Sequence, residues 1–118
     1  LLLCYDQEET EGLPMFFSKK ADEEMLKSFW TWFEQNEEWI IATSKTDGMT
    51  VVNAVDEKLS PAFACYRVEI EFQLGYNDGH GEFFFFDLNK RALRKDAEKL
   101  ASLMPAKLQE NWTFIIEH

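Results

Sequence analysis

The sequence predicts a two-layer α+β sandwich in which N-terminal helices precede a strand–strand–helix–strand unit with a mainly antiparallel sheet. Three observations support this fold class. Apolar residues between positions 21 and 59 recur mostly with helical spacing, residues 66–74 alternate between apolar and polar, and residues 90–104 carry a second helical stripe. Helices followed by a strand unit of this kind are typical of α+β domains.

The first helix begins near Ala21, where Met25, Phe29 and Phe33 recur at intervals of four. A second short helix, or a continuation of the first, fits after Asn36 and ends near the Thr46-Asp47-Gly48 turn. Residues 49–59 are ambiguous, because valines at intervals of four favour a helix while valine itself favours a strand. We choose the helix there.

Residues 66–74 form the clearest strand, with one apolar and one polar face. Three glycines in residues 75–81 indicate a hairpin connection, and residues 82–88 return as the second strand. Asn89 is expected to cap a helix over residues 90–104, and residues 112–117 close the sheet.

Four consecutive phenylalanines, Phe83 to Phe86, cannot all share one face of a strand. A regular hairpin centred on Asp78 would turn Phe84 and Phe86 toward the core. It would place Phe83 and Phe85 on the second face, beside Glu69 and Glu71, with Glu69 opposite Asp87. A one-residue bulge in the glycine loop would exchange the two faces.

The second face therefore needs a cover. The cover is either another part of this chain, such as the tail, a loop or a strand, or a partner protein or second copy of the chain. The partner-binding candidates are Phe83, Phe85, Glu69 and Glu71.

The chain length of 118 residues fits one domain, which we place at residues 15–118. Residues 1–14 are expected to form an acidic tail or linker. Because the chain does not begin with Met, we expect that an upstream segment could be missing.

The net charge is −10, which disfavours nucleic-acid and anionic-membrane binding. The chain also has no apolar run long enough for a membrane span. Cys4 and Cys65 lie far apart without a CxxC motif, so two buried thiols in a reducing cytosol are favoured over a disulfide or a metal site. We therefore expect a cytoplasmic protein.

No residue pattern in the sequence predicts catalysis. The serines lie in no nucleophile motif, the glycines match no nucleotide-binding loop, and no cofactor is indicated. Asp78, His80 and Glu82 have the i, i+2, i+4 spacing of a strand-borne metal site, but a solvated turn is the favoured interpretation. An alternative ligand site would be a cleft between the N-terminal helices and the sheet, with Trp30 and Trp39 in its wall.

Three sequence features also carry a resemblance to a known family. They are the helix motif FWTWF at residues 29–33, the strand VEIEF at residues 68–72, and the ending LMP at 103–105 followed by WTF at 112–114. Together they resemble a bacterial domain-of-unknown-function family with an N-terminal FWxWF helix, over about residues 29–116. The resemblance implies the same order of helices and strands and no known catalytic residue.

The sequence thus predicts a non-enzymatic interaction or self-associating module, binding a protein partner or a second copy as a homodimer. A small-molecule-binding or enzymatic domain is the alternative.

Overall fold

The computed structural model describes residues 20–66 and 68–118. Its N-terminal half is helical, as predicted. The elements there are α2 (Glu23–Gln35), α3 (Glu37–Ser44), α4 (Gly48–Leu59) and the short 3-10 helix η2 (Ser60–Phe63). The ambiguous stretch at residues 49–59 is therefore a helix, and the predicted tail at residues 1–14 lies outside the described residues.

Aspartate side chains cap two of these helices. Asp22 Oδ1 accepts a hydrogen bond from the Met25 backbone N–H at 3.1 Å, and Asp47 Oδ1 accepts one from Thr50 at 3.2 Å. Each cap satisfies a backbone donor that has no partner within the helix. The turn predicted at Thr46-Asp47-Gly48 is therefore the start of α4.

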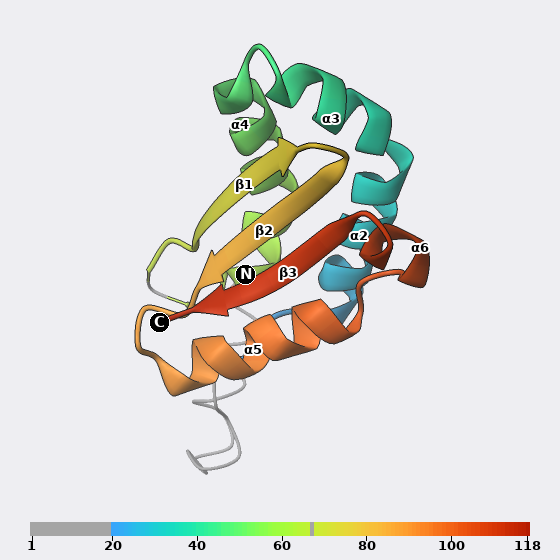
Figure 1. Cartoon of the computed structure of the whole chain (residues 1–118). Helices are drawn as coiled ribbons and strands as arrows, with labels where there is room; N and C mark the ends of the chain where they lie inside the picture. The colour runs from blue at the N-terminus through green and yellow to red at the C-terminus, as the bar shows by residue number, and fades with distance from the viewer. Residues whose placement is uncertain (1–19, 67) are drawn as a thin grey trace, which may run out of the picture.

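The sheet contains three strands in the order β1 (Glu71–Asn77), β2 (His80–Phe86) and β3 (Trp112–Glu117). The β1–β2 pair is the predicted antiparallel hairpin, whereas β3 pairs with β2 in parallel. A parallel pair needs a long crossover, which here is α5 (Arg91–Ser102) and α6 (Ala106–Gln109). The α+β fold class is confirmed, and Figure 1 shows α5 running along β3.

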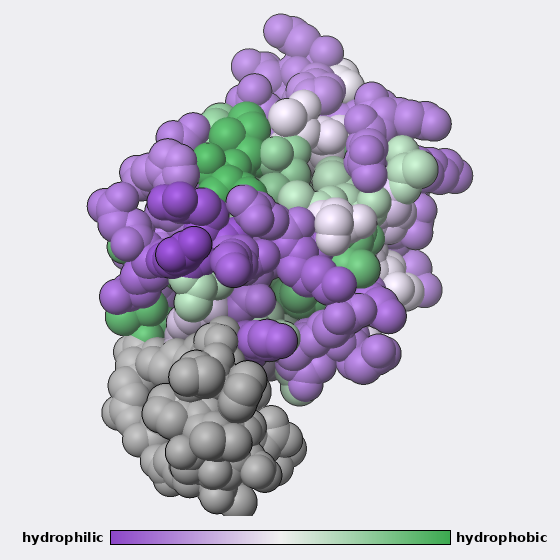
Figure 2. Space-filling view, turned by 90° about the horizontal axis from the view of Figure 1, so that it is seen from below, coloured by the Kyte–Doolittle hydropathy of each residue, from purple (hydrophilic) through white to green (hydrophobic). Residues whose placement is uncertain are grey.

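The crossover helix α5 has one apolar and one polar side, as its predicted stripe requires. Leu93 and Leu100 are buried, whereas Arg91, Lys95 and Glu98 are exposed. Figure 2, which views the molecule from the end where α5 lies, shows a mostly hydrophilic surface there. The helix therefore belongs to the core on one side and to the solvent surface on the other.

The start of α5 differs from the prediction. Asn89 does not cap the helix, because its φ of 58° lies in the left-handed region, and Lys90 is the residue at the cap position. Leu88 has the same conformation, with φ of 54°. Two consecutive left-handed residues turn the chain from β2 into α5, a conformation that non-glycine residues rarely adopt.

The first strand begins five residues later than expected. Residues 66–70 are not part of it, and it continues through residues 75–77, which were expected to be loop. Only Asp78 and Gly79 connect the strands, and both have positive φ angles of 52° and 78°. This is the geometry of a tight two-residue hairpin. The strand pairing is therefore displaced by one residue from the predicted register.

The core lies between the sheet and the helices. Phe83 at the centre of β2 contacts three aromatic rings of α2, those of Phe29, Trp30 and Phe33, at centroid distances of 6.2 to 6.4 Å. Phe85 packs on Phe63 of η2 at 5.4 Å. The FWTWF motif therefore forms the centre of the helical layer over the sheet.

Candidate functional site

The predicted orientation of the four phenylalanines is wrong. Phe72 pairs with Phe85, not with Phe84, and Leu74 pairs with Phe83. Phe83 and Phe85 are 0% exposed and belong to the core. They are covered by the chain's own helices, so in this fold they offer no surface to a partner.

Phe84 and Phe86 consequently lie on the opposite face of the sheet, which we call the outer face. Ile115 of β3 is the direct neighbour of Phe84 across the parallel pair. These three side chains are partly exposed and do not belong to the hydrophobic core or to the residues packed against it. In Figure 1 no helix of the described chain lies over this face.

Carboxylates flank the apolar side chains of the outer face. Glu71 and Glu117 lie on either side of Phe86 in the strand pairing, and Glu82 lies two residues before Phe84. All three glutamates are exposed. The outer face thus combines three apolar side chains with three negative charges, and none of the three carboxylates forms an ion pair within the described residues.

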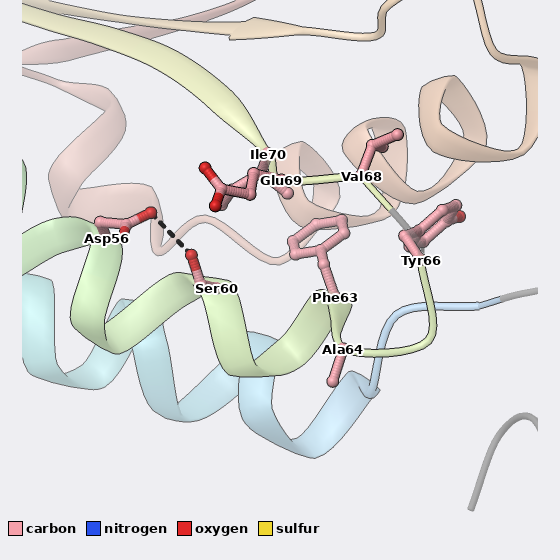
Figure 3. Close-up of a pocket in the computed structure, with 8 residues that line it drawn as sticks. All are labelled: Asp56, Ser60, Phe63, Ala64, Tyr66, Val68, Glu69 and Ile70. Carbon is pink, nitrogen blue, oxygen red and sulfur yellow. Dashed lines mark hydrogen bonds between the residues drawn. The ribbon is translucent and has the colours of Figure 1, made fainter. Parts of the chain in front are cut away.

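The predicted residues Glu69 and Glu71 do not lie beside Phe83 and Phe85. Both are exposed. Glu69 lines two hollows beside α4, and Glu71 lines the second of them, which reaches the start of β1. Figure 3 shows the first hollow, in which the Glu69 side chain lies on the same side as the hydrogen-bonded pair of Ser60 and Asp56. The Ser60 hydroxyl donates to Asp56 Oδ1 at 2.6 Å.

The predicted opposition of Glu69 and Asp87 is also absent. Glu69 precedes β1, while Asp87 is buried directly after the end of β2 and has partners of its own. Arg94 Nε lies 2.8 Å and His118 Nδ1 2.7 Å from Asp87 Oδ2, and the Asn89 backbone N–H donates to Oδ1 at 2.9 Å. The Arg94 hydrogen bond is the main cause that lowers the pKa of Asp87 to about 2. These interactions of Asp87 stabilise the turn at Leu88 and Asn89, which leads into α5.

A second buried carboxylate, Asp96 of α5, links the region before α2 to the segment after η2. Asp96 Oδ2 of α5 accepts hydrogen bonds from the Ala21 backbone N–H at 2.7 Å and from the Tyr66 hydroxyl. Burial raises the pKa of Asp96, and burial together with the Asp96 hydrogen bond raises the pKa of Tyr66. Because both groups serve as cross-links between elements, we assign them a structural role.

The alternative ligand site is not assembled. Trp30 is 1% exposed, and its indole N–H donates to the Leu100 carbonyl oxygen at 2.8 Å within the core. Trp39 is 40% exposed on α3. One tryptophan is part of the core and the other is on the surface, so they do not form the two walls of a cleft.

Asp78, His80 and Glu82, which have the spacing of a metal site, do not form one in the structure. Within the described residues, no group of three or more His, Cys, Asp and Glu side chains has metal-binding geometry. His80 is exposed, and its Nε2 lies 2.7 Å from the Thr113 hydroxyl.

The helices of the described chain include none that is both long and apolar enough to cross a bilayer.

The prediction for the cysteines fails at Cys65. This residue is buried, but it is disulfide-bonded and not a free thiol. Cys4 lies outside the described residues.

Comparison with known proteins gave no match to a family model, to a curated protein or to a solved structure. The resemblance to a bacterial family of unknown function therefore stays a prediction.

Sequence reasoning missed the set of Phe84, Phe86 and Ile115. One signal could have identified part of it. Asp78-Gly79 is a strong two-residue hairpin signal, and it would have placed Phe84 on the face opposite Phe72. The parallel addition of β3, which brings Ile115 beside Phe84, leaves no comparable local signal.

Proposed function

We propose that this domain is a non-enzymatic protein-interaction module that binds its partner through the outer face of the sheet. The observation that carries the proposal is the contiguous set of Phe84, Phe86 and Ile115, which lies outside the core and under no helix of the described chain. Apolar side chains gathered on a face with a polar rim are typical of interaction surfaces.

The polar rim supports a heterologous partner over a second copy. A homodimer through this face would bring Glu71, Glu82 and Glu117 of one copy near the same residues of the other. The chain already carries a net charge of −10, so such an interface would add repulsion.

The test is site-specific photocrosslinking in cells that contain the protein's natural partners. A photoreactive residue at position 84 should capture a defined protein, which should bind the purified domain. Ile115→Ser should weaken that binding at least tenfold. The control position is Met49, which is 68% exposed on α4 and should capture nothing specific. Equal capture at positions 84 and 49, or capture of a second copy of the chain at position 84, would refute the proposal.

The cytoplasmic location expected from the sequence stays a prediction. The disulfide at Cys65 argues against it, because disulfides are rare in the cytosol. Fractionation of cells that express the native protein tests it.

A further inference from the structure

A groove lies beside the start of β1, the edge strand of the described sheet. Two hollows, of about 350 and 390 Å³, adjoin each other there and share Asp56, Glu69 and Ile70 in their walls. The first is lined by residues of α4, η2 and the segment before β1, and Figure 3 shows it. The second continues between α4 and the first three residues of β1, and it reaches Phe86. The groove therefore connects with the outer face of the sheet.

Within the described chain, the edge of β1 has backbone hydrogen-bonding groups that pair with no other element. β1 is the outermost strand, and within the described residues no backbone hydrogen bond from another element reaches residues 68–77 apart from its pairing with β2. Asn77 and His80 close the two-residue turn, and antiparallel pairs alternate in their hydrogen bonding. This alternation directs the backbone N–H and C=O groups of Phe72, Leu74 and Tyr76 to the open edge. Such an edge can pair with another strand.

The groove combines an apolar floor with acidic walls. Phe63 and Ile70 are buried at its base, and Val68 is 39% exposed above them. Asp56, Glu69 and Glu71 are exposed, and no Lys or Arg lines the two hollows within the described chain. Among the described residues, the side chains that line the groove therefore carry negative charge only, in a protein of net charge −10.

We infer that β1 is extended by a strand from a basic partner protein, with lysine or arginine at alternate positions. Glu69 and Glu71 are two residues apart, which is also the interval between side chains on one face of a strand. Basic residues at that interval would match the two carboxylates, while the backbone of the partner pairs with Phe72, Leu74 and Tyr76. Strand addition of this kind obtains affinity from the backbone and specificity from alternate side chains.

The inference rests on the proposed function, because it specifies how the interaction module holds its partner. A basic segment is favoured over a second copy of this chain, since a second copy would add the same carboxylates to the groove. An acidic segment or a nucleic acid is disfavoured by the same charges.

The experiment uses the full chain and three synthetic peptides. One alternates lysine and valine over seven residues, one has glutamate in place of lysine, and one is the lysine peptide with alternate backbone nitrogens methylated. The lysine peptide should bind and slow hydrogen exchange at the amides of Phe72, Leu74 and Tyr76. The other two peptides should bind at least tenfold more weakly, because one reverses the charge and the other removes backbone donors.

Two protein variants complete the test. Glu69→Gln combined with Glu71→Gln should weaken binding of the lysine peptide at least tenfold. The matched control, Glu34→Gln combined with Glu38→Gln, removes two exposed carboxylates from α2 and α3 and should leave binding unchanged. Equal loss in the control pair would mean that net charge alone attracts the peptide, which overturns the inference.

Three further results would also overturn it. Equal binding of the methylated peptide would exclude strand pairing. Slow exchange at Phe72, Leu74 and Tyr76 without peptide would mean that the protein's own chain or a second copy occupies the edge. A partner captured at position 84, together with no effect of the lysine peptide on β1, would refute strand addition and leave the proposed function standing.

Discussion

Phe72 of β1 lies directly opposite Phe85 of β2, and this pairing determines which side chains of the hairpin are buried. Because a strand has a period of two residues, displacing it by one residue moves every side chain to the other face. The pairing places Phe83 and Phe85 under α2 and η2 and leaves Phe84 and Phe86 on the outer face.

This arrangement predicts unequal costs for two adjacent substitutions. Phe85→Ala should lower the free energy of unfolding by about 3–5 kcal/mol, as expected for a buried aromatic residue. Phe84→Ala should cost on the order of 1 kcal/mol, because that side chain is partly exposed and outside the core. Denaturant titration of the two variants measures the difference. A larger loss for Phe84→Ala than for Phe85→Ala would contradict the pairing of Phe72 with Phe85.

The hairpin turn should depend on Gly79. Its φ is 78°, and a Cβ atom there would meet no atom within 4 Å, so only the backbone conformation opposes a side chain. Gly79→Ala should therefore cost about 1–2 kcal/mol, the penalty of the left-handed conformation. Gly75→Ala is the matched control, because it also has open space but no positive φ. Thermal unfolding should separate the two variants, and equal destabilisation would contradict the turn geometry.

Gly81 should be intolerant of any side chain for a different reason. A Cβ atom at this position would lie 2.3 Å from the Trp112 ring. The ring cannot move easily, because it packs on Phe33 at 5.0 Å and its N–H donates to Glu37 Oε2 at 3.0 Å. We expect Gly81→Ala to cost about 1–3 kcal/mol. In calorimetry, Gly48→Ala at the open start of α4 should not destabilise the protein.

The low pKa of Asp87, about 2, predicts a dependence of stability on acid. The folded pKa lies below the ordinary value of 3.8, so ionised Asp87 stabilises the fold above about pH 4, and this contribution is lost as the pH falls toward 2. Asp87→Asn should be less stable than the wild type at pH 6, and the difference should shrink toward pH 2. A difference in stability that stays constant from pH 6 to pH 2 would show that ionisation of Asp87 does not stabilise the fold.

Asp96 should show the opposite pH dependence. Burial raises its folded pKa above 3.8, so the protonated form is favoured in the fold and its contribution decreases as the pH rises through the raised pKa. Asn keeps an oxygen that can accept from Ala21 and Tyr66. The stability of wild type relative to Asp96→Asn should therefore be greatest in acid and should decline toward neutral pH. Urea unfolding of both proteins at pH 3 and pH 7 measures this difference in stability, and a larger wild-type advantage at pH 7 would contradict the prediction.

The helices could be predicted from the sequence because their signals are local. The stripe of Phe29 and Phe33 and the turn at Thr46-Asp47-Gly48 each depend on residues within one or two turns. The third strand at residues 112–117 was also located correctly, because the run of Phe114, Ile115 and Ile116 is a local signal as well.

The faces of the hairpin could be assigned only in part. Alternation shows that Phe83 and Phe85 share one face and Phe84 and Phe86 the other, but it does not say which face is buried. That choice depends on whether the connection contains two residues or more. The Asp78-Gly79 pair carries the information, but the glycines on either side of it suggested a longer loop.

The amino-acid sequence by itself thus determined the order of the elements, the division of the four phenylalanines into two pairs, and the acidic charge. Only the tertiary structure decided that the FWTWF helix covers Phe83 and Phe85, that β3 joins in parallel beside β2, and that Glu69 and Glu71 line a groove beside the start of the edge strand. The physical reason is range: periodicity and capping act within a few residues, whereas burial of a sheet face and exposure of an edge depend on which distant segments pack against it.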